Sequence, residues 1–210
     1  MGIEEILRLA PVMPVVTIED AAQAAPLAQA LLAGGLPAIE VTLRTPAALE
    51  AIAIIAREVP DAWVGAGTVL NPGDLEACVR AGARFAISPG ATRALLDAGR
   101  GAAIPYLPAI ATASELMAGI AAGYGVFKFF PAGVAGGVAA LRALAGPFAQ
   151  ARFCPTGGVD ADNAGAYLAL PNVLCVGGSW ITPKDALAAG DFAWIETLAR
   201  AASKLGRNSA

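Results

Sequence analysis

The sequence predicts an α/β protein of the (β/α)8 (TIM) barrel class, and two observations lead to this prediction. Short apolar runs of β type alternate with Ala- and Leu-rich helical runs along the 210 residues, a rhythm typical of βα units around a parallel sheet. The apolar runs also lack a clean polar face, as expected for strands covered by helices on one side and packed into an interior on the other. An open doubly wound sheet is the alternative, but no G-x-G-x-x-G fingerprint follows the first strand to support it.

We expect eight strands, one in each βα unit, and a single domain over residues 1–210 with a short helix at the N-terminus. In chain order the strands are expected at Val12 to Thr17, Ala38 to Leu43, Trp63 to Gly67, Phe85 to Ser88, Ile104 to Leu107, Val126 to Phe130, Arg152 to Pro155 and Val173 to Val176. Helices are expected between them. Four helix starts have recognisable signals: Glu19-Asp20 in a first turn, Thr45-Pro46 and Asn71-Pro72 as cap and first helical residue, and Thr112 to Glu115 as a capping box.

Composition narrows the classes of partner. Hydrophobic residues make up 57% of the chain, charged residues 15%, and the net charge is -3, which excludes both disorder and a basic nucleic-acid-binding footprint. No apolar stretch approaches the roughly 20 residues needed to span a bilayer. The N-terminus is acidic where a secretory signal would be basic. We therefore expect a cytoplasmic protein whose partner is a small molecule, with no membrane and no nucleic acid involved.

The chain contains no histidine and an odd number of cysteines, Cys78, Cys154 and Cys175. Without a CxxC pair these cysteines form neither a disulfide framework nor a zinc site, and we expect them to be reduced and buried. Imidazole-based proton transfer and imidazole metal ligation are excluded, so acid-base chemistry must come from carboxylates, lysine, tyrosine or water. No metal and no cofactor are expected.

Lys128 is the most informative residue, because it interrupts the apolar run Val126 to Phe130. Desolvation by such neighbours lowers the pKa of an ammonium group, and the neutral amine can add to a ketone to form an iminium. Alternation places Phe130 beside Lys128 in the interior, as a hydrophobic wall. The alternative is a lysine that extends from a strand end to solvent, or that pairs with a carboxylate for structural reasons only.

In a barrel, functional side chains gather at the carboxyl ends of the strands, and the polar residues of this chain do so. Alternation points Glu40 inward, where it is either the general acid and base or one half of a structural ion pair. Arg44 has the geometry to bind a carboxylate in bidentate fashion, or it forms a salt bridge at the rim. Thr68 can donate to the same ligand carboxylate, or it is a strand-end cap.

Two glycine pairs follow the last two strands, in Thr156-Gly157-Gly158 and Gly177-Gly178-Ser179. Barrels commonly bind phosphate at this position through backbone N–H groups. Tight turns that need a positive φ are the alternative explanation.

The strings EVTLRT (40–45), VGAGTVLNP (64–72), FAISPG (85–90), FKFFPA (127–132), RFCPTGGV (152–159) and VLCVGGSW (173–180) closely resemble the family of bacterial 2-keto-3-deoxy-6-phosphogluconate (KDPG/KHG) aldolases. The resemblance implies a homotrimeric class I aldolase of the Entner-Doudoroff pathway that cleaves KDPG to pyruvate and glyceraldehyde 3-phosphate. It implies the following roles: Lys128 as the Schiff-base lysine, Glu40 as the general acid and base, Arg44 and Thr68 as ligands of the pyruvate carboxylate, Pro89 and Phe130 as substrate contacts, Thr156 beside the substrate hydroxyls, and Gly157, Gly158, Gly178 and Ser179 around the phosphate.

Two positions depart from the family pattern. Ala109 stands where the family usually has glycine after the fifth strand, which affects the predicted shape of that loop, and Gly133 stands where a glutamate commonly follows FFPA, which affects a helix start or the mouth. Cleavage of 4-hydroxy-2-oxoglutarate is a further expected activity. The alternatives are a 2-keto-3-deoxy-6-phosphogalactonate aldolase, a metal-free phosphosugar isomerase or epimerase that uses Glu40, and a non-catalytic module that binds phosphate ligands.

Overall fold

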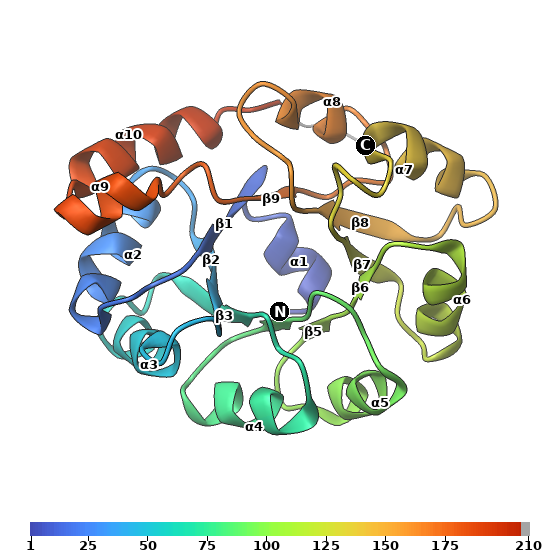
Figure 1. Cartoon of the computed structure of the whole chain (residues 1–210), viewed down its shortest axis with the longest axis horizontal. Coiled ribbons are helices and arrows are strands. Elements are labelled where there is room, and N and C mark those ends of the chain that lie inside the picture. Colours follow the sequence, from blue (N-terminus) through green and yellow to red (C-terminus); the bar gives the residue numbers. More distant parts are fainter. Residues whose placement is uncertain (207–210) are drawn as a thin grey trace.

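The computed structural model describes residues 1–206 and consists of parallel strands curled around a common interior, with helices outside (Figure 1). A six-stranded sheet has the order β5-β4-β3-β2-β1-β9, and a three-stranded sheet has the order β6-β7-β8. All of the pairings are parallel. The strands are β1 (Val12–Val16), β2 (Ala38–Thr42), β3 (Trp63–Gly67), β4 (Ala86–Ile87), β5 (Tyr106–Leu107), β6 (Ala109–Ile110), β7 (Val126–Phe129), β8 (Arg152–Pro155) and β9 (Val176–Gly178).

The two sheets approach each other at both of their edges. On one side, β5 and β6 are separated only by Pro108, and β5 pairs with β4 while β6 pairs with β7. On the other side, isolated parallel bridges join Phe153 to Val173 and Thr156 to Gly177, next to β9. The strands therefore follow one another around the interior as the βα rhythm of the sequence predicts.

The strand predictions are confirmed for most of the chain and need two corrections. The run expected at Ile104 to Leu107 begins only at Tyr106 and continues beyond Pro108 as β6, because proline has no N–H to donate and divides the pairing. The last strand lies at Val176–Gly178 instead of Val173 to Val176. Val173 makes only an isolated bridge, and regular pairing with β1 starts where Val176 meets Val12.

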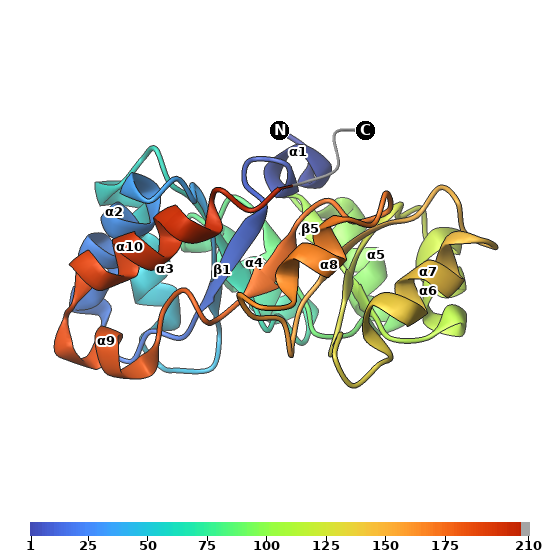
Figure 2. The same cartoon turned by 90° about the horizontal axis from the view of Figure 1, so that it is seen from above.

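Helices follow most strands and cover the outside of the sheets. They are α1 (Ile3–Leu7), η1 (Ala21–Gln23, a 3-10 turn), α2 (Ala24–Ala33), α3 (Ala48–Glu58), α4 (Pro72–Arg80), α5 (Arg93–Gly101), α6 (Ala113–Ala121), α7 (Gly137–Ala145), α8 (Ala164–Leu168), α9 (Lys184–Ala189) and α10 (Phe192–Ala202). The short N-terminal helix is confirmed as α1, which lies across one end of the strands (Figure 2).

Two of the four predicted helix starts are confirmed. The side chain of Asn71 accepts from the N–H of Asp74 at the start of α4, and Thr112 and Glu115 form the capping box of α6. The start at Thr45-Pro46 is wrong: α3 begins at Ala48, because the Thr45 hydroxyl donates to the carbonyl of Ile18 instead of capping a helix.

The remaining start, at Glu19-Asp20, also needs a correction. Asp20 precedes the 3-10 turn η1 and accepts from the N–H of Ala22, so this segment does not open an α-helix. The α-helix of this unit, α2, begins only at Ala24.

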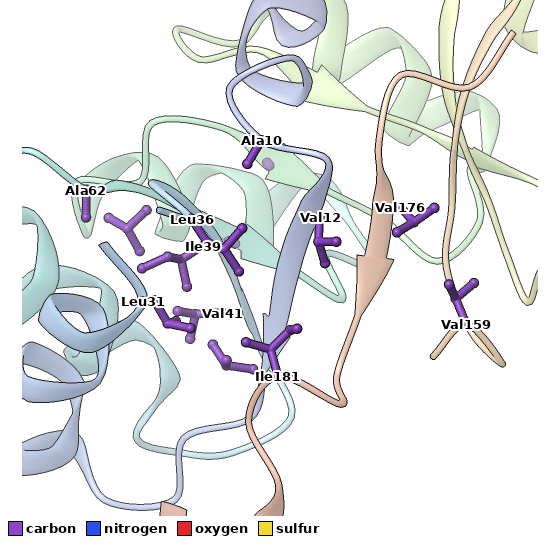
Figure 3. Packing of buried hydrophobic residues seen from close by; sticks show 14 of the residues in the cluster. Ala10, Val12, Leu31, Leu36, Ile39, Val41, Ala62, Val159, Val176 and Ile181 are labelled. Carbon is purple, nitrogen blue, oxygen red and sulfur yellow. The ribbon is translucent and has the colours of Figure 1, made fainter. Parts of the chain in front are cut away.

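Apolar side chains form two separate cores because successive residues of a strand point to opposite faces. Ile39, Val41, Phe127 and Phe129 belong to the outer core between strands and helices. Figure 3 shows part of this core, with Leu31, Leu36, Ile39 and Val41 gathered on the helix side of β2. The inner core consists of ten buried residues. They are Ile6, Leu7, Met13, Ala38, Phe85, Ile87, Leu107, Cys154, Leu174 and Cys175.

No helix among residues 1–206 is long and apolar enough to cross a membrane. The same residues contain no group of three or more acidic, cysteine or histidine side chains placed to hold a metal ion.

Candidate active site

A buried ion pair lies inside the ring of strands. The Nζ of Lys128 donates to Oε1 of Glu40 at 2.8 Å and to Oε2 at 3.2 Å. The side chains are 6% and 2% exposed, respectively, and they are the buried charged residues of the described chain. Charged side chains are almost never fully buried unless paired, so an amine and a carboxylate held here in direct contact mark the first place to look for chemistry.

Strand alternation places both groups in the interior, as the sequence predicts. On β2, Ile39 and Val41 pack into the outer core, which leaves Glu40 on the inner face. On β7, Phe127 and Phe129 pack outward in the same way, which leaves Lys128 inside. The two residues are 88 positions apart in the chain, so only the curvature of the sheets brings them together.

Gly67 provides the space in which the Glu40 carboxylate lies. A Cβ at this position would overlap Oε1, Cγ and Cδ of Glu40. Thr68 follows directly, with a left-handed φ of 60°, which is uncommon for a residue other than glycine. Such a conformation costs on the order of 1–3 kcal/mol and is found most often at functional sites.

A cavity of about 130 Å³ opens next to the ion pair. Its lining includes six of the predicted site residues, which are Arg44, Phe130, Thr156, Gly157, Gly158 and Ser179. Phe130 lines the cavity and its ring centre lies 5.4 Å from the Lys128 Nζ, so this part of the cavity wall lies close to the buried amine. The structure thus brings the residues after four different strands to one place beside the buried amine.

The two glycine pairs serve different geometric needs. Gly157 and Gly158 have positive φ values of 89° and 74°, which a residue with a side chain rarely adopts. The turn explanation therefore holds for this pair, and the turn places its backbone in the cavity wall. Gly177 and Gly178 are needed for close approach instead: a Cβ would overlap the Thr156 side chain at the first and the Trp180 ring at the second.

Three of the predicted substrate-binding residues lie outside the lining of this cavity. Pro89 borders a separate hollow with Leu70 and Thr92. Gly178 is buried against Trp180, one residue before Ser179. Thr68 stands next to Gly67, close in sequence to the Glu40 contact. Their roles in substrate binding stay predictions.

The two departures from the family pattern fall close to the site. Ala109 belongs to strand β6 and is the register partner of Lys128, so this segment is paired strand and not a loop. Gly133 donates its N–H to the carbonyl of Gly157 at 2.9 Å, and α7 begins only at Gly137. Gly133 therefore supports the glycine turn in the cavity wall rather than starting a helix.

Thr17 also lines the cavity, and the sequence reasoning did not select it. Its hydroxyl lies 2.9 Å from that of Thr42, which donates to the carbonyl of Val16. Because the Thr42 proton is used in that bond, Thr17 must donate to Thr42, and only its acceptor positions remain for a ligand. Its place at the carboxyl end of the first strand was the available signal.

The three cysteines are all buried, as predicted. The sulfur atoms of Cys154 and Cys175 are 3.5 Å apart, whereas an S–S bond is about 2.05 Å long, so no disulfide joins them. Burial raises the pKa of the Cys78 thiol to about 12, with a smaller contribution from the charge of Asp74.

Comparison with known proteins identifies the family. The family model for KDPG and KHG aldolases matches residues 3–198, and the chain belongs to this aldolase family. It is 56% identical over 199 residues to the KHG/KDPG aldolase of Escherichia coli K12, a match that covers 95% of this chain and 93% of that protein.

Solved structures of KDPG aldolases are also similar to this chain. A KDPG aldolase from Legionella pneumophila, captured with pyruvate as a covalent carbinolamine intermediate, superposes with a TM-score of 0.94 at 50% identity, covering 96% of this chain and 98% of that one. The Zymomonas mobilis KDPG aldolase with 3-phosphoglycerate gives a TM-score of 0.93 at 49% identity, over 99% and 97% of the two chains.

Proposed function

We propose that this protein is a class I aldolase that reversibly cleaves 2-keto-3-deoxy-6-phosphogluconate to pyruvate and D-glyceraldehyde 3-phosphate. The observation that carries the proposal is the buried contact between Lys128 Nζ and Glu40 at 2.8 Å, beside a cavity with a glycine turn in its wall. Membership of the KDPG and KHG aldolase family and the similarity to an aldolase trapped with pyruvate support it.

The reaction begins when Lys128 loses a proton to Glu40, which is already its hydrogen-bond partner. The neutral amine adds to the keto carbon of the substrate to give a carbinolamine. Glu40 then returns its proton to the carbinolamine hydroxyl, which leaves as water, so that an iminium forms and Glu40 is again a carboxylate. Glu40 then removes the proton from the hydroxyl group two carbons from the iminium carbon. The bond between carbons three and four breaks, and its electrons move into the iminium.

Glu40 completes the cycle in the opposite direction. After glyceraldehyde 3-phosphate leaves, the pyruvyl fragment remains as an enamine, and Glu40 protonates its terminal carbon. Water then hydrolyses the iminium and frees the lysine. One carboxylate can perform both steps because it is the one buried acid among residues 1–206 and is held against the amine.

The remaining predicted residues bind the two charged ends of the substrate and the carbon chain between them. Arg44 and Thr68 bind the carboxylate, for which the guanidinium fork is suited. Backbone N–H groups of the two glycine pairs and the Ser179 hydroxyl bind the phosphate. Thr156, Phe130 and Pro89 contact the carbon chain between them.

We further propose that the two sheets form one closed (β/α)8 barrel and that residues 1–210 make a single domain, of which 207–210 lie outside the described residues. The bridges at both sheet edges support closure. Homotrimer assembly remains a prediction from the resemblance, as does cytoplasmic location. Cleavage of 4-hydroxy-2-oxoglutarate is a proposed second activity, which the name of the E. coli relative supports.

The test is a product assay with purified protein and no added metal. We expect KDPG to yield stoichiometric pyruvate and glyceraldehyde 3-phosphate, each detected by its own dehydrogenase. The galactonate epimer of the substrate should be cleaved more slowly. Interconversion of phosphosugars without pyruvate release would replace the proposal by an isomerase or epimerase, and tight phosphosugar binding without turnover would replace it by a binding module.

A further inference from the structure

A second and larger cavity lies beside the one that contains the glycine turn. Its volume is about 480 Å³, and Thr17 and Arg44 line both cavities. Lys184, the first residue of α9, lines the larger cavity and also a smaller hollow that it shares with Thr17 and Ser179. The exposed Lys184 therefore lines the same hollow as Ser179, whose hydroxyl is proposed to bind the phosphate.

The two cations of this region have no partner of their own. Within residues 1–206, the side chains of Arg44 and Lys184 take part in no hydrogen bond or ion pair. Most other described arginines do have a partner. Arg57 and Arg93 pair with carboxylates, for example, and Arg100 donates to a carbonyl. Two unpaired positive charges at one cavity indicate a site for an anion.

Two carboxylates, those of Glu19 and Asp20, line the same cavity as these cations. Asp20 accepts from the N–H of Ala22, which gives its charge a local partner. Glu19 is exposed, and none of the ion pairs within residues 1–206 joins it to Lys184. Its charge opposes an anionic ligand, so its removal should strengthen the binding of one.

The backbone fixes the position of Lys184 relative to Ser179. The N–H of Thr182 donates to the carbonyl of Ser179 at 3.2 Å, which makes a turn between the two residues. On the opposite wall, Nε2 of Gln23 donates to the carbonyl of Leu187 in α9 at 2.9 Å. The helix that bears Lys184 is therefore tied to both sides of the cavity.

We propose that Lys184 is a specificity-determining residue that binds the phosphate end of the substrate from the rim, opposite the Ser179 hydroxyl. The inference rests on the proposed aldolase function. The carboxylate end of the substrate must lie near Lys128, because the keto carbon next to it bonds to the amine. The phosphate lies at the other end of the six-carbon chain, toward the rim. An ammonium group acts as a point charge that suits a phosphate dianion, whereas the planar fork of Arg44 suits a carboxylate.

The test compares a phosphorylated with an unphosphorylated substrate in the Lys184→Met variant. For KDPG we expect KM to rise roughly three- to tenfold, the range for an accessible charge-assisted contact. The ratio of kcat/KM for KDPG to that for 4-hydroxy-2-oxoglutarate should fall by the same factor. The inhibition constant of inorganic phosphate should also rise. Glu19→Gln should shift the KM for KDPG in the opposite direction.

Lys204→Met is the matched control, because Lys204 is exposed, carries the same charge and lines none of these cavities. The inference is wrong if Lys184→Met and Lys204→Met have the same KM for KDPG. It is also wrong if kcat/KM of the Lys184 variant falls by the same factor for KDPG and for 4-hydroxy-2-oxoglutarate. In both cases the aldolase function stands. Absence of KDPG cleavage by the unmodified protein would instead reject the proposed function itself.

Discussion

The two ends of the strands differ sharply in character. At the amino end, α1 closes the interior with Ile6 and Leu7, which are 0% and 1% exposed and pack in the inner core. At the carboxyl end the interior is charged, with the Lys128–Glu40 pair, and opens into cavities. The change takes place within single strands. On β7, Val126 packs against the inner core and Lys128 forms the ion pair, and Phe130, directly after this strand, lines the cavity.

The residues that stabilise the interior and those proposed to carry out the chemistry therefore lie in two different layers, an apolar layer at the amino end of the strands and a polar layer at the carboxyl end. Cys154 lies in the inner core, while Thr156, two residues further along the chain, lines the cavity at the carboxyl end. A substitution in one layer should therefore affect stability with little effect on catalysis, and a substitution in the other should do the reverse. The following predictions test how strictly the two layers are separated.

The largest expected effect is that of Glu40→Gln, at the carboxyl end of the strands. The amide cannot accept or return a proton, so exchange of the pyruvate methyl protons with deuterated solvent should slow by roughly 10²- to 10⁴-fold. Proton NMR of pyruvate measures this rate directly. The exposed Glu76 provides a control, Glu76→Gln. Exchange at the unmodified rate in the Glu40 variant would remove Glu40 from the mechanism.

Gly67→Ala should reduce turnover although it replaces no charged residue. The added methyl group would overlap the Glu40 carboxylate and push it away from Lys128, and a shift of about 1 Å can cost on the order of 10²-fold in rate. Steady-state kinetics with KDPG measures the loss. Gly165→Ala in α8 is the control, because a Cβ there meets nothing within 4 Å. Equal kcat in both variants would show that the Glu40 position tolerates displacement.

At the sealed end, Leu7→Ala should lower the free energy of unfolding by about 2–5 kcal/mol, the usual cost of a buried Leu-to-Ala change. The value of kcat below the unfolding transition should stay within about twofold, since a change away from the site leaves the geometry of the reacting groups intact. Urea unfolding and steady-state kinetics give the two numbers. Met117→Ala is the control for a large apolar truncation, because Met117 is an exposed residue of α6. A parallel loss of kcat in the Leu7 variant would mean that the layers are coupled.

The smallest expected effect concerns pH and the outer core. Burial raises the pKa of Cys78 from its usual 9.0 to about 12. The folded state therefore holds this proton more tightly, so its contribution to stability is complete below pH 9 and is lost as pH rises toward 12. The free energy of unfolding should fall less steeply between pH 9 and 11 in Cys78→Ala than in the unmodified protein. Identical slopes in urea titrations across this range would contradict the prediction.

Side-chain direction inside the sheets could be predicted from the sequence, since it depends only on a period of two residues. This period predicts that Glu40 and Lys128 point into the interior, and the structure pairs them there. Features that depend on contacts distant in sequence could not be predicted. Thr45 resembles a helix cap, yet its hydroxyl bonds to Ile18. Likewise Lys184 follows no motif, and only the folded chain reveals that it borders the Ser179 surface.

Trapping with pyruvate and borohydride tests the central claim most directly, namely that Lys128 bonds covalently to a 2-oxo acid. Reduction of the iminium should leave a stable secondary amine on the peptide that contains Lys128, which mass spectrometry of a digest can locate. We expect one modified lysine per chain, and no modification at that position in Lys128→Arg. An adduct on Lys184 or Lys204 instead, or none at all in folded protein, would contradict it.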